Sequence, residues 1–501
     1  MRDLFCSYYT NSKAITSYMA AKLDITQNDR ILEPSAGEGI FIDEILEKNK
    51  TVPIDALDIN RQAVAILKKK YESNAAVLVR ETDTLLDKQL DVLGDSGGYY
   101  SKVIGNPPYG AWQNYEKRNL LKKKYAGHYV KETYSLFLLR CISVLKLHGR
   151  LSFIIPDTYL FLNMYSRLRE VLFTNTRIDE ILIFPSRFFP GVSFGYSNLS
   201  IITLERCKNN EAVHNTFRVV QGFGSPGEFA LLLEKDERLP QHLQVFHFQQ
   251  KDILDRDQCR MILAENKTSS LLSKGSKKLG DVADVVTGLY TGDNLRFIRS
   301  AHKDVKGAKN YAVVEPDKVF CCTSLYGIPN VQEGYVPYIK SASRRRYVRQ
   351  NEEWFVRWDR KTIEFYNSNK KSRFQNSSFY FKTGIGIPMV KSAAIRGFLM
   401  SNHVFDQSIV GIFPKDTTKL YYLLALVNSD VINGLIHAIN PSANNSANYI
   451  KQLPYREPDE EILKRVNNKV QELISLEEAE NYDKADDLHK ELNAIIGQIY
   501  S

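Results

Sequence analysis

Up to about residue 205, the sequence alternates short β-branched runs with stretches of helical periodicity, and this alternation most constrains the fold. Strands that are joined through helices run parallel, because each crossover returns the chain to the same end of the sheet. The sequence therefore predicts an α/β fold, with a mostly parallel sheet covered by helices on both faces. The predicted strands are 30–32, 53–57, 75–79, 102–104, 151–155, 178–184 and 198–204; the predicted helices are 13–23, 40–49, 61–71, 134–147 (capped by Gly149) and 159–173.

Polar clusters follow the first three predicted strands. The segment Glu33–Gly39 follows the first strand, Asp58 follows the second and Asp83 follows the third. Because ligands of such sheets bind at the carboxyl ends of the strands, we expect these clusters to form one site. Asp58 is placed to accept hydrogen bonds from two ribose hydroxyls, and Asp83 to accept one from an exocyclic amine. Taken singly, each cluster is equally well explained by a glycine turn or a helix N-cap, and their succession favours the shared site.

The glycine-rich cluster favours a cofactor that presents no phosphate. Gly37 and Gly39 allow a tight turn and a close approach of the backbone to a ligand. Glu33 and Glu38 place negative charge there, and no lysine stands where a phosphate-binding loop requires one. The loop therefore suits a cationic or hydroxyl-bearing cofactor.

The fourth predicted strand leads directly into Asn106-Pro107-Pro108-Tyr109. The two prolines remove two backbone donors and hold Asn106 in extended geometry, so the asparagine amide points outward from a strand end. An amide oxygen, a carbonyl and an aromatic face together suit a planar ring that carries an amino group. A plain Pro-Pro turn after a strand is the alternative interpretation.

In their order along the chain, these elements resemble the motifs of N6-adenine-specific DNA methyltransferases of restriction–modification systems, in the gamma arrangement. That arrangement places the cofactor motifs first and the target-recognition domain last. The resemblance implies a Rossmann-like S-adenosylmethionine-dependent methyltransferase domain; it is strong up to about residue 205 and looser after about residue 270. In one departure, Thr10 is followed by Asn11 where the family commonly has proline, which affects the N-terminal loop. The matching segments are Tyr9-Thr10, Glu33–Gly39, Asp58, Asp83, Asn106–Tyr109 and Phe188-Phe189-Pro190.

The resemblance implies site-specific transfer of a methyl group from S-adenosylmethionine to the N6 amino group of adenine in duplex DNA, with the target base flipped out of the helix. Asn106 and the carbonyl of Pro107 would hold the adenine amino group. Tyr109 and Phe189 would stack on the base, with Phe194 as a competitor for Phe189. The residues implied in contact with S-adenosylmethionine are Thr10, Glu33, Gly37, Asp58, Asp83 and Pro107.

Two basic regions are candidates for contact with nucleic acid. Residues 110–132 follow the Asn-Pro-Pro-Tyr turn and are predicted as a long basic loop, which either lies over the target strand or is merely solvated. Residues 340–400 hold 14 Lys and Arg against 4 Asp and Glu, with aromatic residues interleaved. This local excess of +10 exceeds the +9 of the whole chain and predicts a DNA-docking surface, with a solvated face as the alternative. The candidate phosphate contacts are Arg344, Arg345, Arg346 and Arg349.

The remaining features suggest three domains. We predict a catalytic domain over 1–245, a target-recognition domain over 265–455 and a helical segment over 456–501. The run 279–294 predicts a hairpin at the start of the second domain, and the polar segment 440–448 is a further candidate for reaching base edges. The last segment holds 6 basic and 12 acidic residues and two stretches of helical spacing, which predicts a bracing or partner helix pair rather than a phosphate contact.

The composition argues against several other classes of protein. The longest apolar runs are too short to span a membrane, and the first residues lack the apolar core of a secretory signal. Six scattered cysteines form no C-x-x-C pair, which favours reduced thiols over disulfides or zinc. We therefore predict a cytoplasmic protein that needs no metal. The resemblance to restriction–modification enzymes implies a monomer on DNA and allows a separately encoded cognate restriction endonuclease, whose existence the sequence does not decide.

Other activities share parts of this pattern. An RNA adenine methyltransferase or a protein-glutamine methyltransferase would carry the same core, and the basic second half disfavours the glutamine enzyme. A non-catalytic DNA-specificity subunit would be expected to have lost the Asn-Pro-Pro-Tyr element or the cofactor loop, and both are intact. A fused restriction enzyme would need a nuclease cluster of the Asp…Glu-x-Lys type, which we do not find.

Overall fold

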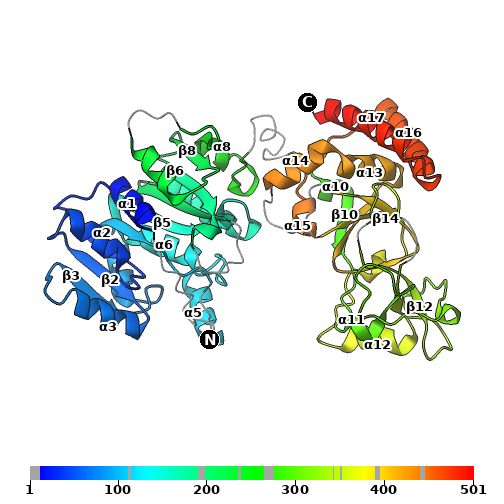
Figure 1. Ribbon diagram of the computed structural model, residues 1–501, viewed down its shortest axis with the longest axis horizontal. Helices are drawn as coiled ribbons and strands as arrows, with labels where there is room; N and C mark the ends of the chain where they lie inside the picture. Colours follow the sequence, from blue (N-terminus) through cyan, green and yellow to red (C-terminus); the bar gives the residue numbers. More distant parts are fainter. Residues whose placement is uncertain are drawn as a thin grey trace. The chain divides into compact units, whose positions relative to one another are not determined.

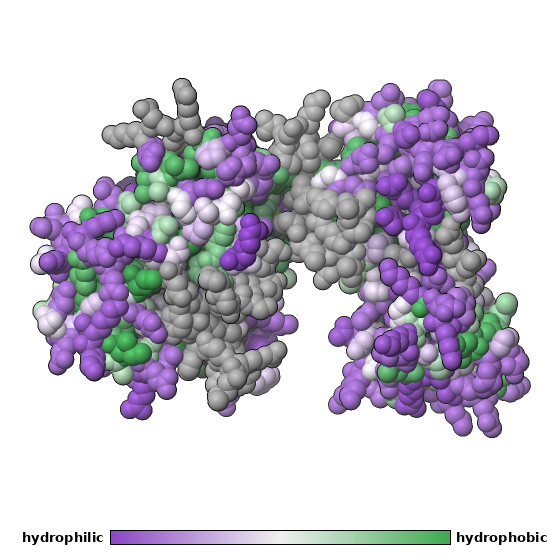
Figure 2. Space-filling view, in the orientation of Figure 1, coloured by the Kyte–Doolittle hydropathy of each residue, from purple (hydrophilic) through white to green (hydrophobic). Residues whose placement is uncertain are grey.

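The computed structural model describes residues 12–110, 114–189, 198–234, 239–263, 276–341, 343–349, 353–389, 395–439 and 446–500. The chain divides into two units, Met1–Leu263 and Ala264–Ser501, which are described separately (Figure 1). Within the described ranges, no helix is both long enough and apolar enough to cross a membrane. The face of each unit seen in Figure 2 is mainly hydrophilic, as expected for surfaces exposed to water.

The first unit is built on one sheet, with nine strands among its described residues. Their order is β3-β2-β1-β4-β5-β7-β6-β8-β9. The first five neighbours pair in parallel and follow the order of doubly wound nucleotide-binding sheets, whereas β7 inserts antiparallel between β5 and β6. The strands are β1 Ile31–Glu33, β2 Ile54–Asp58, β3 Val77–Glu81, β4 Tyr100–Gly105, β5 Leu145–Pro156, β6 Thr176–Pro185, β7 Asn198–Arg206, β8 Thr216–Gln221 and β9 Gln244–Gln249.

Helices connect the strands of this sheet and pack with it into one hydrophobic core. Ile31, Val103 and Ile154, from three neighbouring strands, are fully buried in that core. Near-continuous apolar runs are expected in strands that are covered on both faces. The helices are α1 Lys13–Lys22, α2 Ile40–Lys48, α3 Arg61–Lys70, α4 Lys88–Asp95, α5 Tyr115–Lys124, α6 Tyr134–Val144, α7 Ser166–Asn175 and α8 Gln250–Leu254, with 3-10 turns at Asp157–Leu160, Asn163–Tyr165, Ser186–Phe188, Pro226–Leu233 and Asp257–Cys259.

Three predicted elements of the first unit were wrong in detail. The helix expected over 134–147 ends at Val144, because Leu145 pairs with Tyr100 and begins β5, which also contains the expected cap Gly149. The helix expected over 159–173 is two 3-10 turns followed by α7. The loop expected over 110–132 contains α5, whose N-cap Asn114 accepts a hydrogen bond from the backbone nitrogen of Lys117.

Within its described residues, the second unit contains two small sheets and a group of helices. The sheets have the orders β10-β17-β14-β15 and β11-β13-β12-β16. Their strands are β10 Ala283–Thr287, β11 Ile298–Ser300, β12 Tyr335–Ile339, β13 Trp354–Arg357, β14 Gly384–Pro388, β15 Phe398–Met400, β16 Val404–Phe405 and β17 Ile409–Pro414. The helices are α10 Leu279–Val282, α11 Asn294–Phe297, α12 Arg360–Ser368, α13 Leu420–Asn428, α14 Asp430–Ile439, α15 Ala447–Ile450, α16 Glu460–Glu478 and α17 Tyr482–Tyr500, with 3-10 turns at Pro316–Lys318, Ser377–Phe379 and Thr417–Lys419.

Long-range pairing dominates this second unit. The hairpin expected over 279–294 does not form: β10 pairs antiparallel with β17, more than a hundred residues further along the chain. The two helices expected in the acidic C-terminal segment are confirmed as α16 and α17. Asp459 caps α16 by accepting a hydrogen bond from the backbone nitrogen of Ile462, and both helices pack against α13.

Candidate active site

The loop Glu33–Gly39 joins β1 to α2 and is held by the neighbouring strand. The backbone nitrogen of Gly37 donates to Asp58 Oδ2 at 2.8 Å, and that of Ala36 donates to the carbonyl of Leu57 at the same distance. Gly39 has a φ of +79°, and a Cβ there would lie 2.6 Å from the hydroxyl of Tyr71. Only glycine fits both requirements, so the loop is a fixed, tight entry into α2.

Asp58 ends β2 and faces this loop. Its carboxylate oxygens accept hydrogen bonds from backbone N–H groups, Oδ2 from Gly37 and Oδ1 from Asn60 at 2.7 Å. Burial raises the pKa of Asp58, and the backbone hydrogen bonds oppose that shift. Since each carboxylate oxygen can accept two hydrogen bonds, the group can also receive the two hydroxyls of a ribose.

Glu33, the last residue of β1, is a buried acid without a complete set of partners. Its residue is 1% exposed, and Oε2 has no hydrogen-bond partner in the described part of the chain. Burial raises the pKa of Glu33 well above its usual value, and the nearby negative charges of Asp58 and Asp43 raise it further. An orphaned buried oxygen beside a glycine-rich loop fits a ligand that donates a hydrogen bond or carries positive charge.

Asp83, two residues beyond β3, is held by a partner that the sequence did not indicate. Lys117 on α5 places its Nζ 2.7 Å from Asp83 Oδ2, and Asp83 Oδ1 accepts from the backbone nitrogen of Leu85. Both side chains of the ion pair are about a quarter exposed. A ligand amine at Asp83 would therefore share the carboxylate with Lys117 or displace it.

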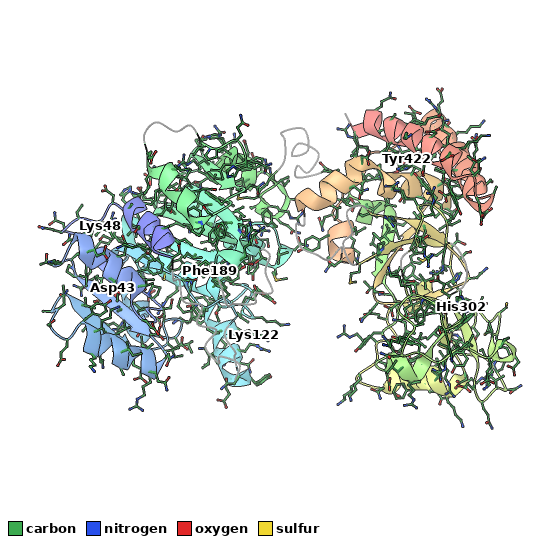
Figure 3. The ribbon with its side chains drawn as sticks, in the orientation of Figure 1. Asp43, Lys48, Lys122, Phe189, His302 and Tyr422 are labelled. Atoms are coloured by element: carbon green, nitrogen blue, oxygen red, sulfur yellow. The ribbon has the colours of Figure 1, made fainter. Side chains whose placement is uncertain are left out.

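Further contacts anchor α5 beside the end of β3. Lys124 pairs with Asp91 at 2.7 Å, and the hydroxyl of Tyr125, which follows the helix, donates to the carbonyl of Leu85 at 3.0 Å. Lys122, on the same helix, is labelled in Figure 3. The basic segment after the Asn-Pro-Pro-Tyr turn thus packs against the cofactor side of the sheet through its described residues.

The Asn106 turn lies next to the glycine-rich loop. Ser35 Oγ of that loop donates to the carbonyl of Asn106 at 3.4 Å, and the hydroxyl of Tyr109 donates to Asn106 Oδ1 at 2.7 Å. Thr133, just before α6, donates its hydroxyl to the carbonyl of Pro108 at 2.6 Å. The structure therefore brings the proposed catalytic turn and the proposed cofactor loop together, and it fixes the orientation of the asparagine amide.

The two rings expected to stack on a base are both buried. Tyr109 is 1% exposed and Phe189 is 3% exposed. Phe189, labelled in Figure 3, stacks against Phe184 with ring centroids 6.3 Å apart. A base could reach these rings only after neighbouring groups move, so their stacking role stays a prediction. Thr10, Pro190 and Phe194 lie outside the described residues.

Sequence reasoning also missed several residues around this site. Besides Lys117 and Thr133, Thr84 donates its hydroxyl to the carbonyl of Pro34 at 2.6 Å. Asp157 follows β5 at the same edge of the sheet, is 7% exposed and accepts a hydrogen bond from Asn198. Burial raises the pKa of Asp157 to about 7. Its place directly after an apolar strand was the signal that would have identified it.

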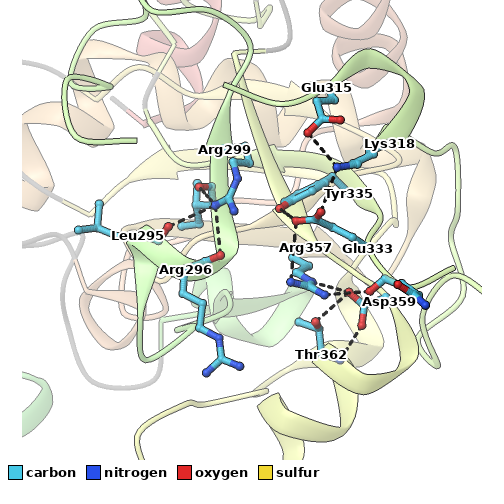
Figure 4. Close-up of polar contacts among 12 residues, drawn as sticks. Leu295, Arg296, Arg299, Glu315, Lys318, Glu333, Tyr335, Arg357, Asp359 and Thr362 are labelled. Carbon is cyan, nitrogen blue, oxygen red and sulfur yellow. Dashed lines mark hydrogen bonds and ion pairs between the residues drawn. The ribbon is translucent and has the colours of Figure 1, made fainter. Parts of the chain in front are cut away.

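Some arginines of the basic region 340–400 already pair with acids, so fewer of them are available to DNA than the composition predicts. Arg345 pairs with Glu477 and Asp486, and Arg357 donates to Asp359 within the polar network shown in Figure 4. Arg344 is exposed, whereas Arg346 and Arg349 are half-buried. Most of the polar segment 440–448 lies outside the described residues. In the described ranges, no group of three or more His, Cys, Asp or Glu residues could hold a metal ion.

Comparisons with known proteins agree with this picture. Residues 15–189 match the family model of the Eco57I restriction-modification methylase. The chain is 29% identical over 187 residues to the Type II methyltransferase M.HincII of Haemophilus influenzae, which covers 36% of this chain and 34% of that protein. It is 22% identical over 366 residues to the adenine-specific methyltransferase BrxX of Escherichia coli O9:H4 (strain HS), which covers 71% of this chain and 28% of that protein.

A solved structure extends the likeness to the fold of nearly the whole chain. It is that of a nuclease-deletion mutant of the Type ISP restriction-modification enzyme LlaGI in complex with a DNA substrate mimic. It matches with a TM-score of 0.59 and 14% identity, over 94% of this chain and 47% of that one. The α/β fold class and the resemblance to restriction–modification methyltransferases, adenine-specific relatives included, are thus confirmed. The chain spans about a third of the length of the curated relatives described above.

Proposed function

We propose that this chain transfers a methyl group from S-adenosylmethionine to the N6 amino group of adenine in duplex DNA, at a specific site, as the modification activity of a restriction–modification system. The observation that carries the proposal is the contact between Ser35 and the carbonyl of Asn106. It joins a loop suited to a cationic, hydroxyl-bearing cofactor to a turn suited to an amino-bearing ring. The family match over 15–189 includes both elements.

The cofactor site is assigned to residues whose chemistry fits the sulfonium nucleoside. Asp58 would accept the ribose hydroxyls, and Glu33 offers an unused buried oxygen beside the loop. Gly37 turns the backbone close to the ligand, and Asp83 would accept the amine of the cofactor's adenine. Thr10 and Pro107 are assigned by resemblance. Bound there, S-adenosylmethionine supplies an activated methyl group that requires in-line positioning rather than a strong base.

Asn106 and Pro107 would act on the target amine. The lone pair of the adenine amino group is delocalised into the ring, which makes the group a weak nucleophile. Hydrogen bonds from its two N–H groups to Asn106 Oδ1 and to the Pro107 carbonyl would localise that lone pair toward the methyl group. The hydroxyl of Tyr109 donates to the same Oδ1, so it orients the amide for this role.

The target base must leave the duplex to reach this turn. Flipping costs a few kcal/mol, and stacking on an aromatic ring returns about 1–3 kcal/mol per ring. Tyr109 and Phe189 are the proposed rings, and their burial implies that binding of the base is accompanied by local rearrangement. The second unit would dock on the DNA, with the chain acting in the cytoplasm as a monomer beside a separately encoded endonuclease.

The proposal is tested by expressing the chain in a host that lacks adenine methylation and sequencing its DNA for modified bases. We expect N6-methyladenine at one recurring sequence and none with Asn106→Ala expressed at the same level. Modified adenines that appear equally with both proteins, or with neither, would contradict it. Modification of host RNA in place of DNA would favour the RNA methyltransferase instead.

A further inference from the structure

A pocket of about 200 Å³ lies within the second unit. It is bounded by the segment between β12 and β13, by the residue before Gly397, and by α16 and α17. Four arginines line it together with two acids: Arg344, Arg345, Arg346, Arg396, Glu477 and Asp486. Four guanidinium groups against two carboxylates leave two positive charges in excess.

Arg345 forms ion pairs with both acids. Its Nε and Nη2 donate to the two carboxylate oxygens of Glu477 at 2.6–3.0 Å, and Nη2 also pairs with Asp486 at 2.9 Å. The guanidinium lies over the ring of Tyr482, 4.6 Å from its centroid. Hydrogen bonding to Glu477 raises the pKa of Arg345. Arg345 and its two carboxylates therefore form a fixed part of the wall with a net charge of −1, and the other three arginines carry +3, which leaves the excess of two.

Those three arginines have capacity left for a ligand. Arg344 is 76% exposed in its side chain, and within the described ranges its ion pair is with Glu353, at 4.0 Å. Nε of Arg346 is buried and has no hydrogen-bond partner among the described residues. Arg396 is exposed and donates Nη1 to the carbonyl of Arg344 at 3.2 Å, which holds two of the guanidinium-bearing segments together. A buried donor without a protein partner is able to bind an acceptor oxygen of a ligand.

A strained turn brings the arginines into one place. Tyr347 has a φ of +68°, and the backbone nitrogen of Val348 donates to the carbonyl of Arg346 at 2.8 Å, which forms a γ-turn of the rare positive-φ type. Such a conformation in a bulky residue persists only when its surroundings hold it. Backbone hydrogen bonds to Gly397 and Leu399 do so, and they place Arg346 beside Arg396.

Two further lining residues, Tyr347 and His489, add no charge to the pocket. The hydroxyl of Tyr347 and Nδ1 of His489 share a hydrogen bond of 2.8 Å. Burial and the nearby charge of Arg346 together lower the pKa of His489 to about 4, although Asp430 and Asp486 oppose the shift, so the ring is uncharged near neutral pH. The histidine therefore adds no charge of its own, and the pocket retains its excess of two.

We propose that this pocket binds a phosphate group, held by Arg344, Arg346 and Arg396 against the fixed wall formed by Arg345 and Glu477. Guanidinium forks match the oxygens of phosphate and give the strongest hydrogen bonds available to it. An excess of two positive charges matches the charge of a phosphate dianion or of two neighbouring phosphodiester groups. The phosphate comes either from the backbone of bound DNA or from a free phosphate compound. The assignment does not depend on the proposed methyl transfer.

The test uses the full chain and inorganic phosphate, followed by a short DNA duplex. Isothermal calorimetry should show saturable phosphate binding to the wild type, and the pair Arg346→Gln and Arg396→Gln should weaken it at least about tenfold. Arg360→Gln, which removes an exposed arginine of α12 outside the pocket, is the matched control and should leave it within about twofold. Unchanged thermal melting of the double variant would show that the fold is intact.

The duplex identifies the source of the phosphate. If the DNA backbone occupies the pocket, inorganic phosphate should compete with the duplex, and the double variant should lose affinity for both. If a free phosphate compound occupies it, the double variant should lose only inorganic phosphate. The proposal is overturned if the wild type shows no saturable binding of phosphate, or if the double variant binds it as well as the wild type. Neither result bears on methyl transfer, which is measured separately.

Discussion

The two units gather charge of opposite sign, by different means. In the first unit, Glu33 and Asp58 meet because neighbouring parallel strands end at the same edge of one sheet. In the second unit, Arg346 and Arg396 meet because a strained turn pairs with a segment fifty residues further on. The acids suit a cationic, hydroxyl-bearing cofactor, and the arginines suit phosphate. A regular sheet therefore placed the first site predictably, whereas the second depends on long-range pairing that is specific to this fold.

Of the variants predicted here, Asn106→Ala in the first unit should have the largest effect, and that effect is on methyl transfer. Removing one positioned hydrogen-bonding group from an active site typically lowers turnover 100- to 1000-fold. We expect a fall of about that size in single-turnover methyl transfer, because Oδ1 would no longer accept a hydrogen bond from the target amine. Affinity for S-adenosylmethionine should change less than about twofold. Turnover near that of the wild type would remove Asn106 from the reaction.

Arg345→Ala should separate structural from ligand-binding arginines. Glu477 is 4% exposed, so losing its partner should lower the free energy of unfolding of the second unit by about 3 kcal/mol. Chemical denaturation measures this loss, and adding Glu477→Gln to the same chain should recover part of it. Arg346→Ala should cost much less stability. Equal destabilisation by both single variants would mean that the two arginines do not differ in role.

Asp58→Ala should weaken binding to the first unit alone. The loss of hydrogen bonds to a charged group predicts a decrease in S-adenosylmethionine binding of about 1.5–3 kcal/mol by calorimetry. Asp58→Asn, which keeps one acceptor oxygen, should lose less. Phosphate binding by the second unit should not change in either variant. An unchanged affinity for the cofactor in Asp58→Ala would exclude Asp58 from the ribose site.

Lys117→Met should have the smallest effect, and in the opposite direction. Lys117 occupies Asp83 at 2.7 Å, and a part-exposed ion pair contributes about 0–1 kcal/mol. Its removal should free Asp83 and raise affinity for S-adenosylmethionine up to about fivefold. Lys124→Met removes an equivalent lysine of α5 that pairs with Asp91, and it should leave affinity unchanged. Weaker binding by Lys117→Met alone would indicate that Lys117 contacts the cofactor rather than competing with it.

These differences also explain what the sequence could predict. The convergence of Glu33, Asp58 and Asn106 could be predicted, because strand ends in a parallel sheet meet at one edge whatever the details of packing. The start of β5 at Leu145 was missed, since pairing with Tyr100 overrides the helical spacing of that segment. The ion pair of Arg345 with Glu477 joins residues more than a hundred positions apart, so no local sequence pattern predicts it. The composition predicts that the second unit carries an excess of positive charge. It does not predict which of the arginines remain available to bind a ligand.

The position of the transferred methyl group tests the central claim most directly. Purified chain is incubated with S-adenosylmethionine and matched DNA and RNA duplexes, and the digested nucleosides are identified by mass spectrometry. We predict N6-methyladenine from the DNA duplex, none from the RNA and none from either with Asn106→Ala. Methylation of cytosine, methylation of RNA alone, or no transfer to DNA under conditions where the cofactor binds would contradict the account.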